Sequence, residues 1–343
     1  MQRPIQIAAC TLLLATSVAS HAAGDIAVTI TPERGAYGKR DEVLVTVTLT
    51  NTGSTPERLL KWRTPFVAPE APLFEITRDG QPVRYLGRKV KRAAPVDADH
   101  IELAPGESRS ARVELSANWD MAVTGAYSVR YRVPALASSA KAGGAVRSNS
   151  ASLWIEGRLA RGAASPALAA PTGSGLSYSQ CSNAQQETIA GAMAAGSAMA
   201  GGGLAYLTSG KEQAQRYTNW FGALDGARQA RVTKNFTQIK DAFETKPVKV
   251  DCACDEDYFA YVYPAQPYTI YVCKAFWTAA MTGTDSMGGT LLHELSHFDI
   301  VAGTDDHVYG QSGAAEMART APERAVNNAD SHEYFGENSP PLN

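Results

Sequence analysis

The sequence has almost no net charge, which limits the kinds of partner to expect. Its 32 basic residues nearly balance its 34 acidic residues, so the formal net charge is -2 at pH 7. This balance gives no electrostatic reason to expect nucleic acid or an anionic membrane as a partner. A length of 343 residues, with 44% hydrophobic and 19% charged residues, suits a globular protein of two domains. We expect a monomer.

Long hydrophobic runs are lacking after the first residues of the chain. The uncharged apolar run at residues 5–18 follows Arg3 and precedes the small-x-small site at residues 20–22. This pattern is typical of a secretory signal peptide, here residues 1–22. A membrane anchor is the alternative, but a span needs roughly eighteen or more apolar residues. We therefore expect a secreted, extracellular protein without membrane contact.

Cysteine is scarce. Cys10 lies in the signal peptide, which leaves Cys181, Cys252, Cys254 and Cys273. An even number of cysteines in an oxidising compartment indicates disulfides. Cys252 and Cys254 are too close in an extended chain to pair easily with each other, so each is expected to pair with one of the other two. A zinc site is the alternative, but the paired C-x2-C spacing that signals one is missing.

The N-terminal half lacks any catalytic cluster. Apolar and polar residues alternate there with period two, which predicts strands, at residues 26–30, 43–49, 74–77 and 127–132. Turn signals such as N-T-G and R-D-G separate these segments. Several short strands in residues 23–157 favour an all-β domain, an immunoglobulin-like sandwich.

Residues 158–176 contain no lysine and are rich in small residues and proline. We expect a flexible linker that proteases can nick, followed by a catalytic domain at residues 177–343. In that domain residues 182–207 predict a helix that glycines 201–203 must kink or end. Residues 211–245 predict one long amphipathic helix. Short strands are expected at residues 248–252, 259–263 and 268–273, and a mostly helical remainder gives an α+β fold.

An H-E-x-x-H motif occupies residues 293–297. His293 and His297 lie four residues apart, so they share one face of a helix and can bind one Zn2+ together. Glu294 then lies close enough to take a proton from metal-bound water. A chance match is the alternative, expected in on the order of one chain in a hundred of this length. The helix is backed by a buried stripe of Leu291, Leu295 and Phe298.

A catalytic zinc ion needs a third protein ligand and one open position. A metzincin would have glycine at 300 and histidine at 303, so Ile300 and Gly303 exclude that class. A gluzincin would use a later glutamate, for which Glu316 is available. Asp306 follows a glycine turn that could return its carboxylate to the metal. Nearby alternatives are Asp299, Asp305 and His307.

The two motifs together resemble a known family. H-E-L-S-H at residues 293–297 and G-T-D-D-H-V-Y-G at residues 303–310 are similar to the aspzincin signature H-E-x-x-H…G-T-x-D-x-x-Y-G. The aspzincins comprise deuterolysin and the peptidyl-Lys metalloendopeptidases. The resemblance covers about residues 177–343 and is closest to exported bacterial members with a large propeptide. It extends through segments at 216–222, 259–264, 276–277, 282–286 and 328–335.

The resemblance implies a zincin-type metalloendopeptidase that acts on proteins and peptides and holds one catalytic Zn2+. It implies His293, His297 and Asp306 as zinc ligands and Glu294 as the general base. Tyr309 matches the family tyrosine that hydrogen-bonds the oxyanion, although a packed aromatic is its simpler interpretation. Two functions remain as alternatives, a gluzincin-type protease and a non-enzymatic exported adhesin with a structural zinc.

The family also implies the pairs Cys181–Cys252 and Cys254–Cys273, and it makes Glu316 a structural helix residue.

Asp330 and Glu333 align with the family's acidic pocket for a lysine side chain, which implies cleavage on the amino side of lysine. Arginine is not excluded. Alternatively, Asp330 caps a helix and Glu333 completes its capping box.

Residues 23 to about 171 are expected to be a removable propeptide that blocks the active site as an intramolecular inhibitor. Its basic segment at residues 85–92 contains Lys89 and Lys91, either of which could mimic a substrate lysine. Alternatively, these lysines are solvated charges on a sheet edge.

Overall fold

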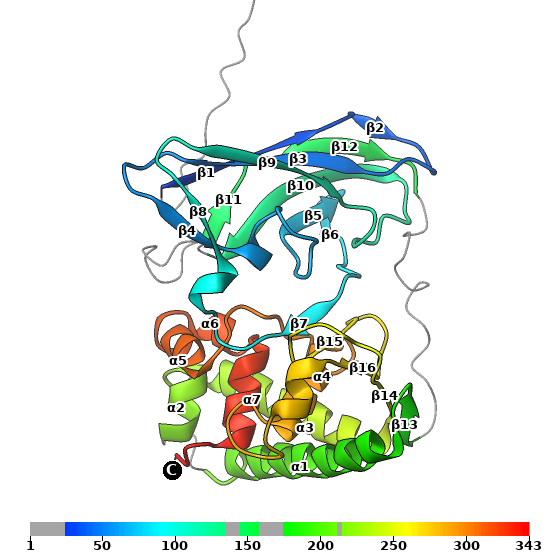
Figure 1. Ribbon diagram of the computed structural model, residues 1–343, viewed down its shortest axis with the longest axis vertical. Helices are drawn as coiled ribbons and strands as arrows, with labels where there is room; N and C mark the ends of the chain where they lie inside the picture. The colour runs from blue at the N-terminus through cyan, green and yellow to red at the C-terminus, as the bar shows by residue number, and fades with distance from the viewer. Residues whose placement is uncertain (1–24, 135–144, 158–173, 211–214, 343) are drawn as a thin grey trace, which may run out of the picture.

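The computed structural model describes residues 25–134, 145–157, 174–210 and 215–342. The predicted signal peptide and most of the predicted linker lie outside these ranges. In Figure 1 a β-rich N-terminal half lies above a largely helical C-terminal half, and the two meet at β7. No helix among the described residues is both long and apolar enough to cross a membrane.

The N-terminal half is built of strands on two stacked sheets, which Figure 1 shows one over the other. One sheet has the antiparallel order β1-β3-β9, and the larger one has the order β2-β12-β10-β5-β6 with β11 paired to β10; β4 and β8 form a separate pair. The strands are β1 (Ile26–Pro32), β2 (Ala36–Tyr37), β3 (Leu44–Asn51), β4 (Glu57–Leu60), β5 (Phe74–Arg78), β6 (Gln81–Pro82), β8 (His100–Leu103), β9 (Ser108–Glu114), β10 (Gly125–Pro134), β11 (Ala145–Arg147) and β12 (Ala151–Ile155).

The predicted period-two alternation accounts for this packing. In β3 every second residue is buried, including Val45, Val47 and Leu49. The inward residues of β10, among them Tyr127 and Val129, belong to the same buried cluster. Side chains from both sheets therefore form a single core, as expected when two half-buried sheets face each other.

The described part of the C-terminal half combines a sheet with seven α-helices. Its sheet has the order β13-β14-β16-β15-β7. The strands are β13 (Gly175–Ser179), β14 (Pro247–Asp251), β15 (Ala260–Val262) and β16 (Thr269–Val272), and β7 (Lys89–Lys91) is supplied by the N-terminal half. The helices are α1 (Asn183–Leu207), α2 (Gln215–Phe221), α3 (Gly226–Thr245), α4 (Met287–His297), α5 (Gln311–Thr320), α6 (Pro322–Ala325) and α7 (Ala329–Glu337). β13 begins two residues before the predicted start of this domain.

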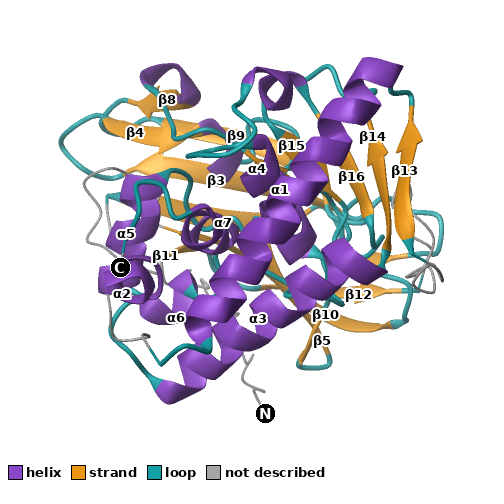
Figure 2. Ribbon diagram, turned by 90° about the horizontal axis from the view of Figure 1, so that it is seen from below, coloured by secondary structure: helices purple, strands orange, loops and turns teal. Residues whose placement is uncertain are grey.

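Helix α1 does not kink or end at glycines 201–203, so that prediction was wrong. The helix is continuous to Leu207. A Cβ atom at Gly203 would lie 2.7 Å from Cε1 of Phe236 in α3. Figure 2 shows α1 and α3 crossing the helical half side by side. The glycine therefore permits close packing of the two helices rather than a change of direction.

The single helix predicted over residues 211–245 was also wrong. Two helices, α2 and α3, are present, and they are separated at Gly222, whose φ is +82°. That left-handed conformation ends α2 at little steric cost for glycine. The Asp225 side chain then accepts a hydrogen bond from the Arg228 amide and caps α3.

Two disulfides connect strands of the C-terminal sheet to the segments next to them. Cys181 pairs with Cys252, and Cys254 pairs with Cys273. These are the pairs that the family resemblance implied. They fix the start of α1 to the end of β14, and the loop before β15 to the end of β16.

The close approach of α1 and α3 gives a stability prediction. Gly203→Ala should lower the free energy of unfolding by about 1–3 kcal/mol because its methyl group overlaps Phe236. Gly202→Ala is the matched control, since nothing lies within 4 Å of a Cβ there, and it should raise the free energy by up to about 1 kcal/mol. Hydrogen exchange of α1 and α3 in urea, measured in a Glu294→Ala background, checks both. Equal effects would contradict the packing explanation.

Candidate active site

Helix α4 carries the H-E-x-x-H motif at the centre of the helical half. The Ser286 side chain caps it by accepting a hydrogen bond from the Gly289 amide, and all eleven of its residues are buried. Leu291 and Leu295 belong to the main core cluster. The predicted helix and its buried stripe are therefore confirmed. His293 and His297 project from the other face with ring centroids 4.8 Å apart.

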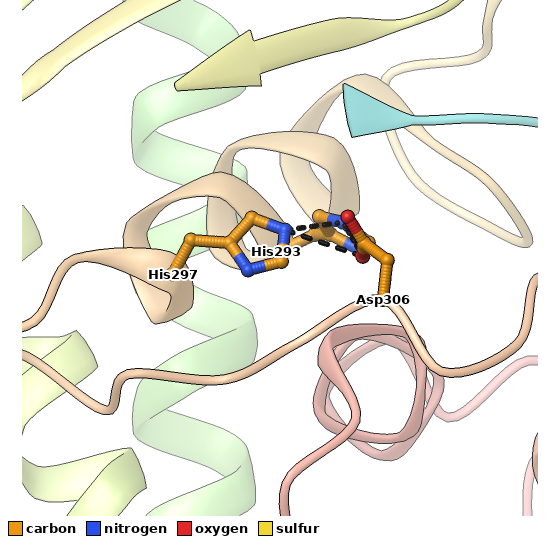
Figure 3. A group of neighbouring side chains, drawn as sticks. All are labelled: His293, His297 and Asp306. Carbon is orange, nitrogen blue, oxygen red and sulfur yellow. Dashed lines mark hydrogen bonds and ion pairs between the residues drawn. The ribbon is translucent and has the colours of Figure 1, made fainter. Parts of the chain in front are cut away.

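A turn after α4 brings Asp306 to the two histidines. Gly303 has a φ of +60°, so the backbone reverses where glycine is tolerated. Oδ1 of Asp306 lies 3.1 Å from Nε2 of His293 and 3.2 Å from Nε2 of His297. Figure 3 shows the three side chains converging.

The outer nitrogens of both rings fix the direction of the lone pairs. Nδ1 of His297 donates to the carbonyl of Thr304 at 2.9 Å. Nδ1 of His293 lies 3.0 Å from Asp330 Oδ1 and 3.1 Å from Glu333 Oε2. With both Nδ1 hydrogens so engaged, the two Nε2 lone pairs face each other across 3.1 Å.

A positive charge is needed among three electron-pair donors held this close. Burial alone would lower the pKa of His293, but the hydrogen bonds and charges of Asp306, Asp330 and Glu333 outweigh burial and raise that pKa well above its usual value. Two imidazole nitrogens and one carboxylate oxygen form a donor set that suits a catalytic zinc ion with an open fourth position. The residues present therefore fit zinc.

Glu294 lies next to this donor set, on the same helix. Its carboxylate is fully buried, and neither oxygen has a hydrogen-bond partner among the described residues. Burial raises the pKa of Glu294 to about 8. A carboxylate with a raised pKa and two free acceptor atoms is suited to take and return a proton.

Tyr309 points toward the N-terminal half. Its hydroxyl donates a hydrogen bond of 2.6 Å to the carbonyl of Val90 in β7. Burial raises the pKa of Tyr309 well above its usual value, so the hydroxyl keeps its proton. Tyr309 also packs edge-on against Trp62 of the N-terminal half.

Asp330 and Glu333 form an acidic pocket on α7, and Lys91 fills it. Nζ of Lys91 lies 2.6 Å from Glu333 Oε2 and 3.8 Å from Asp330 Oδ1. The helix-capping alternative was wrong, because the N-cap of α7 is Asn328. Asp330 instead accepts a hydrogen bond from the Gly310 amide at 2.7 Å.

Asp285 is a third carboxylate in this pocket, and no role was predicted for it from the sequence. Its Oδ1 lies 3.2 Å from Nζ of Lys91 and accepts a hydrogen bond from Tyr334 at 2.8 Å. The only signal was its place in the family-like segment 282–286. Nothing in the sequence places that segment beside α7.

Lys89 and Lys91 are both buried, with exposed fractions of 7% and 0%. The solvated-edge alternative for these two lysines was therefore wrong. Strand β7 pairs antiparallel with β15, with Lys91 opposite Ala260 and Lys89 opposite Val262. Figure 1 shows β7 beside β15. The basic segment thus continues the catalytic sheet.

Among the described residues, none of the remaining ligand alternatives joins the two histidines in a cluster of possible metal ligands. Glu316 is exposed and pairs with Arg319 across one turn of α5. Asp299 is exposed as well. Asp305 pairs with Lys89, and His307 faces the Asn327 amide at 3.4 Å.

Comparison with known proteins adds independent findings. A family profile described as lysine-specific metallo-endopeptidase matches residues 206–337. An extracellular protease of Aeromonas hydrophila is 48% identical over 315 residues, which cover 89% of this chain and 91% of that protein. A peptidyl-Lys metalloendopeptidase of Armillaria mellea is 36% identical, with 86% of this chain and 87% of that protein covered. A solved zinc peptidase from Grifola frondosa is 42% identical, with a TM-score of 0.46, over 48% of this chain and 100% of that structure.

The donor set predicts which carboxylate holds the metal. Asp306→Ala should abolish zinc retention and peptide hydrolysis, because it removes the oxygen that both Nε2 atoms face. Glu316→Ala is the control, since that side chain lies in a surface ion pair, and it should keep zinc and activity. Metal content of the purified variants measures the difference. Equal zinc in Asp306→Ala and the unaltered protein would refute the assignment.

Proposed function

The chain belongs to the aspzincin family of zinc metalloendopeptidases, and we propose that it is exported as a blocked precursor whose mature form cuts on the amino side of lysine. Hydrolysis of peptide bonds with a catalytic zinc ion is the activity of the family. The proposals of lysine specificity and of a blocked precursor rest on one observation. The acidic pocket beside the donor set holds the ammonium of Lys91.

In this proposal His293, His297 and Asp306 hold the zinc ion. When bound, zinc lowers the pKa of its water toward ~7 and polarises the scissile carbonyl. Glu294 takes the proton from the attacking water and returns it to the leaving amine. The Tyr309 hydroxyl donates a hydrogen bond to the developing oxyanion, as it does to the Val90 carbonyl.

Lysine specificity is supported by the charge and burial of the pocket. Burial lowers the pKa of Lys91, but the charges of Glu333, Asp330 and Asp285 outweigh burial and raise that pKa well above its usual value. The ammonium therefore stays charged although it is fully buried. A compact point charge among carboxylates is well matched to a lysine side chain.

The blocking role is supported by the way β7 lies against the catalytic half. Lys91 occupies the acidic pocket while the carbonyl before it meets Tyr309, so the Val90–Lys91 bond lies where a scissile bond would be expected. Arg63 anchors the same half by donating to the carbonyl of His307. A tethered segment acts at high effective concentration, so it excludes substrate until the linker is cut.

We assign the segments accordingly. Residues 1–22 are the signal peptide, residues 23–157 an immunoglobulin-like sandwich that serves as propeptide, residues 158–176 the linker, and residues 177–343 the catalytic domain. The linker contains no lysine, so its cleavage requires a looser specificity or another protease. The name of the Aeromonas relative, an extracellular protease, supports export.

The specificity proposal predicts the peptides that the mature enzyme releases. Peptides from a mixed protein substrate should begin with lysine when they are identified by mass spectrometry. Asp285→Asn should lower kcat/KM for lysine substrates about three- to ten-fold because it removes one partly exposed carboxylate from the pocket. Glu316→Gln, the control, should not. New amino termini without lysine enrichment would refute the specificity.

The blocking proposal predicts the activity of the uncut precursor. The uncut precursor should hydrolyse a small lysine peptide slowly, and Lys91→Met should raise that rate at least about ten-fold, because β7 loses its charge in a buried acidic pocket. Lys39→Met, on the exposed surface, is the matched control. The rate is followed together with gel analysis of the intact chain. Full activity of the uncut, unaltered precursor would rule out the block.

A further inference from the structure

Strand β7 presents two lysines, not one, to the catalytic half. Side chains alternate along a strand, so Lys89 and Lys91 point to the same side. Lys91 enters the acidic pocket of α7, and the Val90 carbonyl between them accepts from Tyr309. If Lys91 takes the place of the lysine after the cut, Lys89 takes the place of the second residue before it.

Lys89 is bound in a site of its own. Its Nζ lies 2.7 Å from Asp305 Oδ1 and donates to the carbonyl of Thr304 at 2.6 Å. Only 7% of the residue is exposed. A lysine is rarely buried to this degree unless an opposite charge and hydrogen bonds compensate it. Both compensating groups belong to the catalytic half.

The catalytic half holds these acceptors in place without help from the N-terminal half. The second carboxylate oxygen of Asp305 accepts a hydrogen bond from the Asn327 side-chain amide at 3.0 Å. The Asp305 amide donates to the Asn327 carbonyl at 2.7 Å, and the Asp305 carbonyl accepts from the Ala329 amide at 3.0 Å. Oδ1 therefore remains directed at the ammonium, and it would do so equally for a bound peptide.

This site is separate from the pocket that receives Lys91. The Thr304 carbonyl also accepts from Nδ1 of His297, so the site adjoins the metal-binding histidine and uses none of the α7 carboxylates that bind Lys91. Residue 305 is the variable position of G-T-x-D. The signature therefore does not itself require a carboxylate at this position.

We propose that Asp305 and the Thr304 carbonyl form a second cation-binding subsite, which favours substrates with a lysine two positions before the lysine at the cut. The substrate class is therefore a basic Lys-x-Lys peptide, cut before the second lysine. This inference rests on the proposed direction of cleavage. Two separate acidic sites on the catalytic half, each facing one lysine of β7, account for the burial of both lysines.

The experiment uses the mature enzyme as purified and peptides that differ at one position. All contain a fixed lysine after the cut, and the residue two positions before it is lysine, norleucine or glutamate. Lysine should give a kcat/KM about ten-fold higher than norleucine, the gain expected from one charge-assisted hydrogen bond at a partly exposed carboxylate. The glutamate peptide should have the lowest kcat/KM because its carboxylate is repelled by the carboxylate of Asp305. Norleucine controls for the apolar part of the side chain.

Variants then locate the effect. In Asp305→Asn the ratio of kcat/KM for the lysine and norleucine peptides should fall toward one. Glu316→Gln is the control, because it removes an acidic charge that lies in a surface ion pair with Arg319, and it should keep the ratio. Zinc content of each variant is measured to show that the metal site is intact.

The outcomes separate this inference from the proposed function. Equal kcat/KM for the lysine and norleucine peptides, with both cut before the fixed lysine, would overturn the subsite and leave the lysine specificity standing. A preference that survives unchanged in Asp305→Asn would also overturn it. Cleavage of neither peptide before the fixed lysine would instead refute the proposed function. The peptide series on unaltered enzyme decides the question even if Asp305→Asn fails to fold.

Discussion

Three electron-pair donors face one another across about 3 Å at the centre of the helical half. The arrangement of the elements around them depends on holding these donors together. The two Nε2 atoms are 3.1 Å apart, and Oδ1 of Asp306 lies within 3.2 Å of both. Such a cluster is stable only around a positive charge. Complete burial of α4, the positive φ of Gly303 and the acceptors on both Nδ1 atoms all hold the donors in this arrangement.

In the proposed function, the carboxylates of α7 connect metal binding with recognition of the substrate lysine. Asp330 and Glu333 lie about 3 Å from Nδ1 of His293, and they also lie around the ammonium of Lys91. Acceptors on the outer nitrogen of a metal-binding histidine fix its orientation and raise its basicity. In this proposal the same two side chains orient a zinc ligand, His293, and supply the negative charge of the pocket. A substitution there is expected to affect both.

The parts of the site that are close in sequence could be predicted from their spacing. The parts assembled by tertiary contacts could not, and Asp330 and Glu333 were assigned only through the family resemblance. H-E-x-x-H specifies two histidines on one helical face, and the G-T-x-D turn places Asp306 from only nine residues away. Asp285, by contrast, reaches the pocket through a contact with Tyr334, 49 residues later. Glycines 201–203 were misjudged because helix propensity does not register the approach of Phe236. The pairing of β7 with β15 joins strands about 170 residues apart, and no local pattern encodes it.

The zinc anomalous signal from a crystal of the full chain tests the central claim most directly. A second group of donors, His293, Asp330 and Glu333, also lies close enough to hold a metal ion, but the Lys91 ammonium is bound there. The account predicts one anomalous peak, about 2.0–2.2 Å from Nε2 of His293, Nε2 of His297 and Oδ1 of Asp306. A peak bonded to Nδ1 of His293 and the α7 carboxylates, or no peak at the three donors, would contradict it.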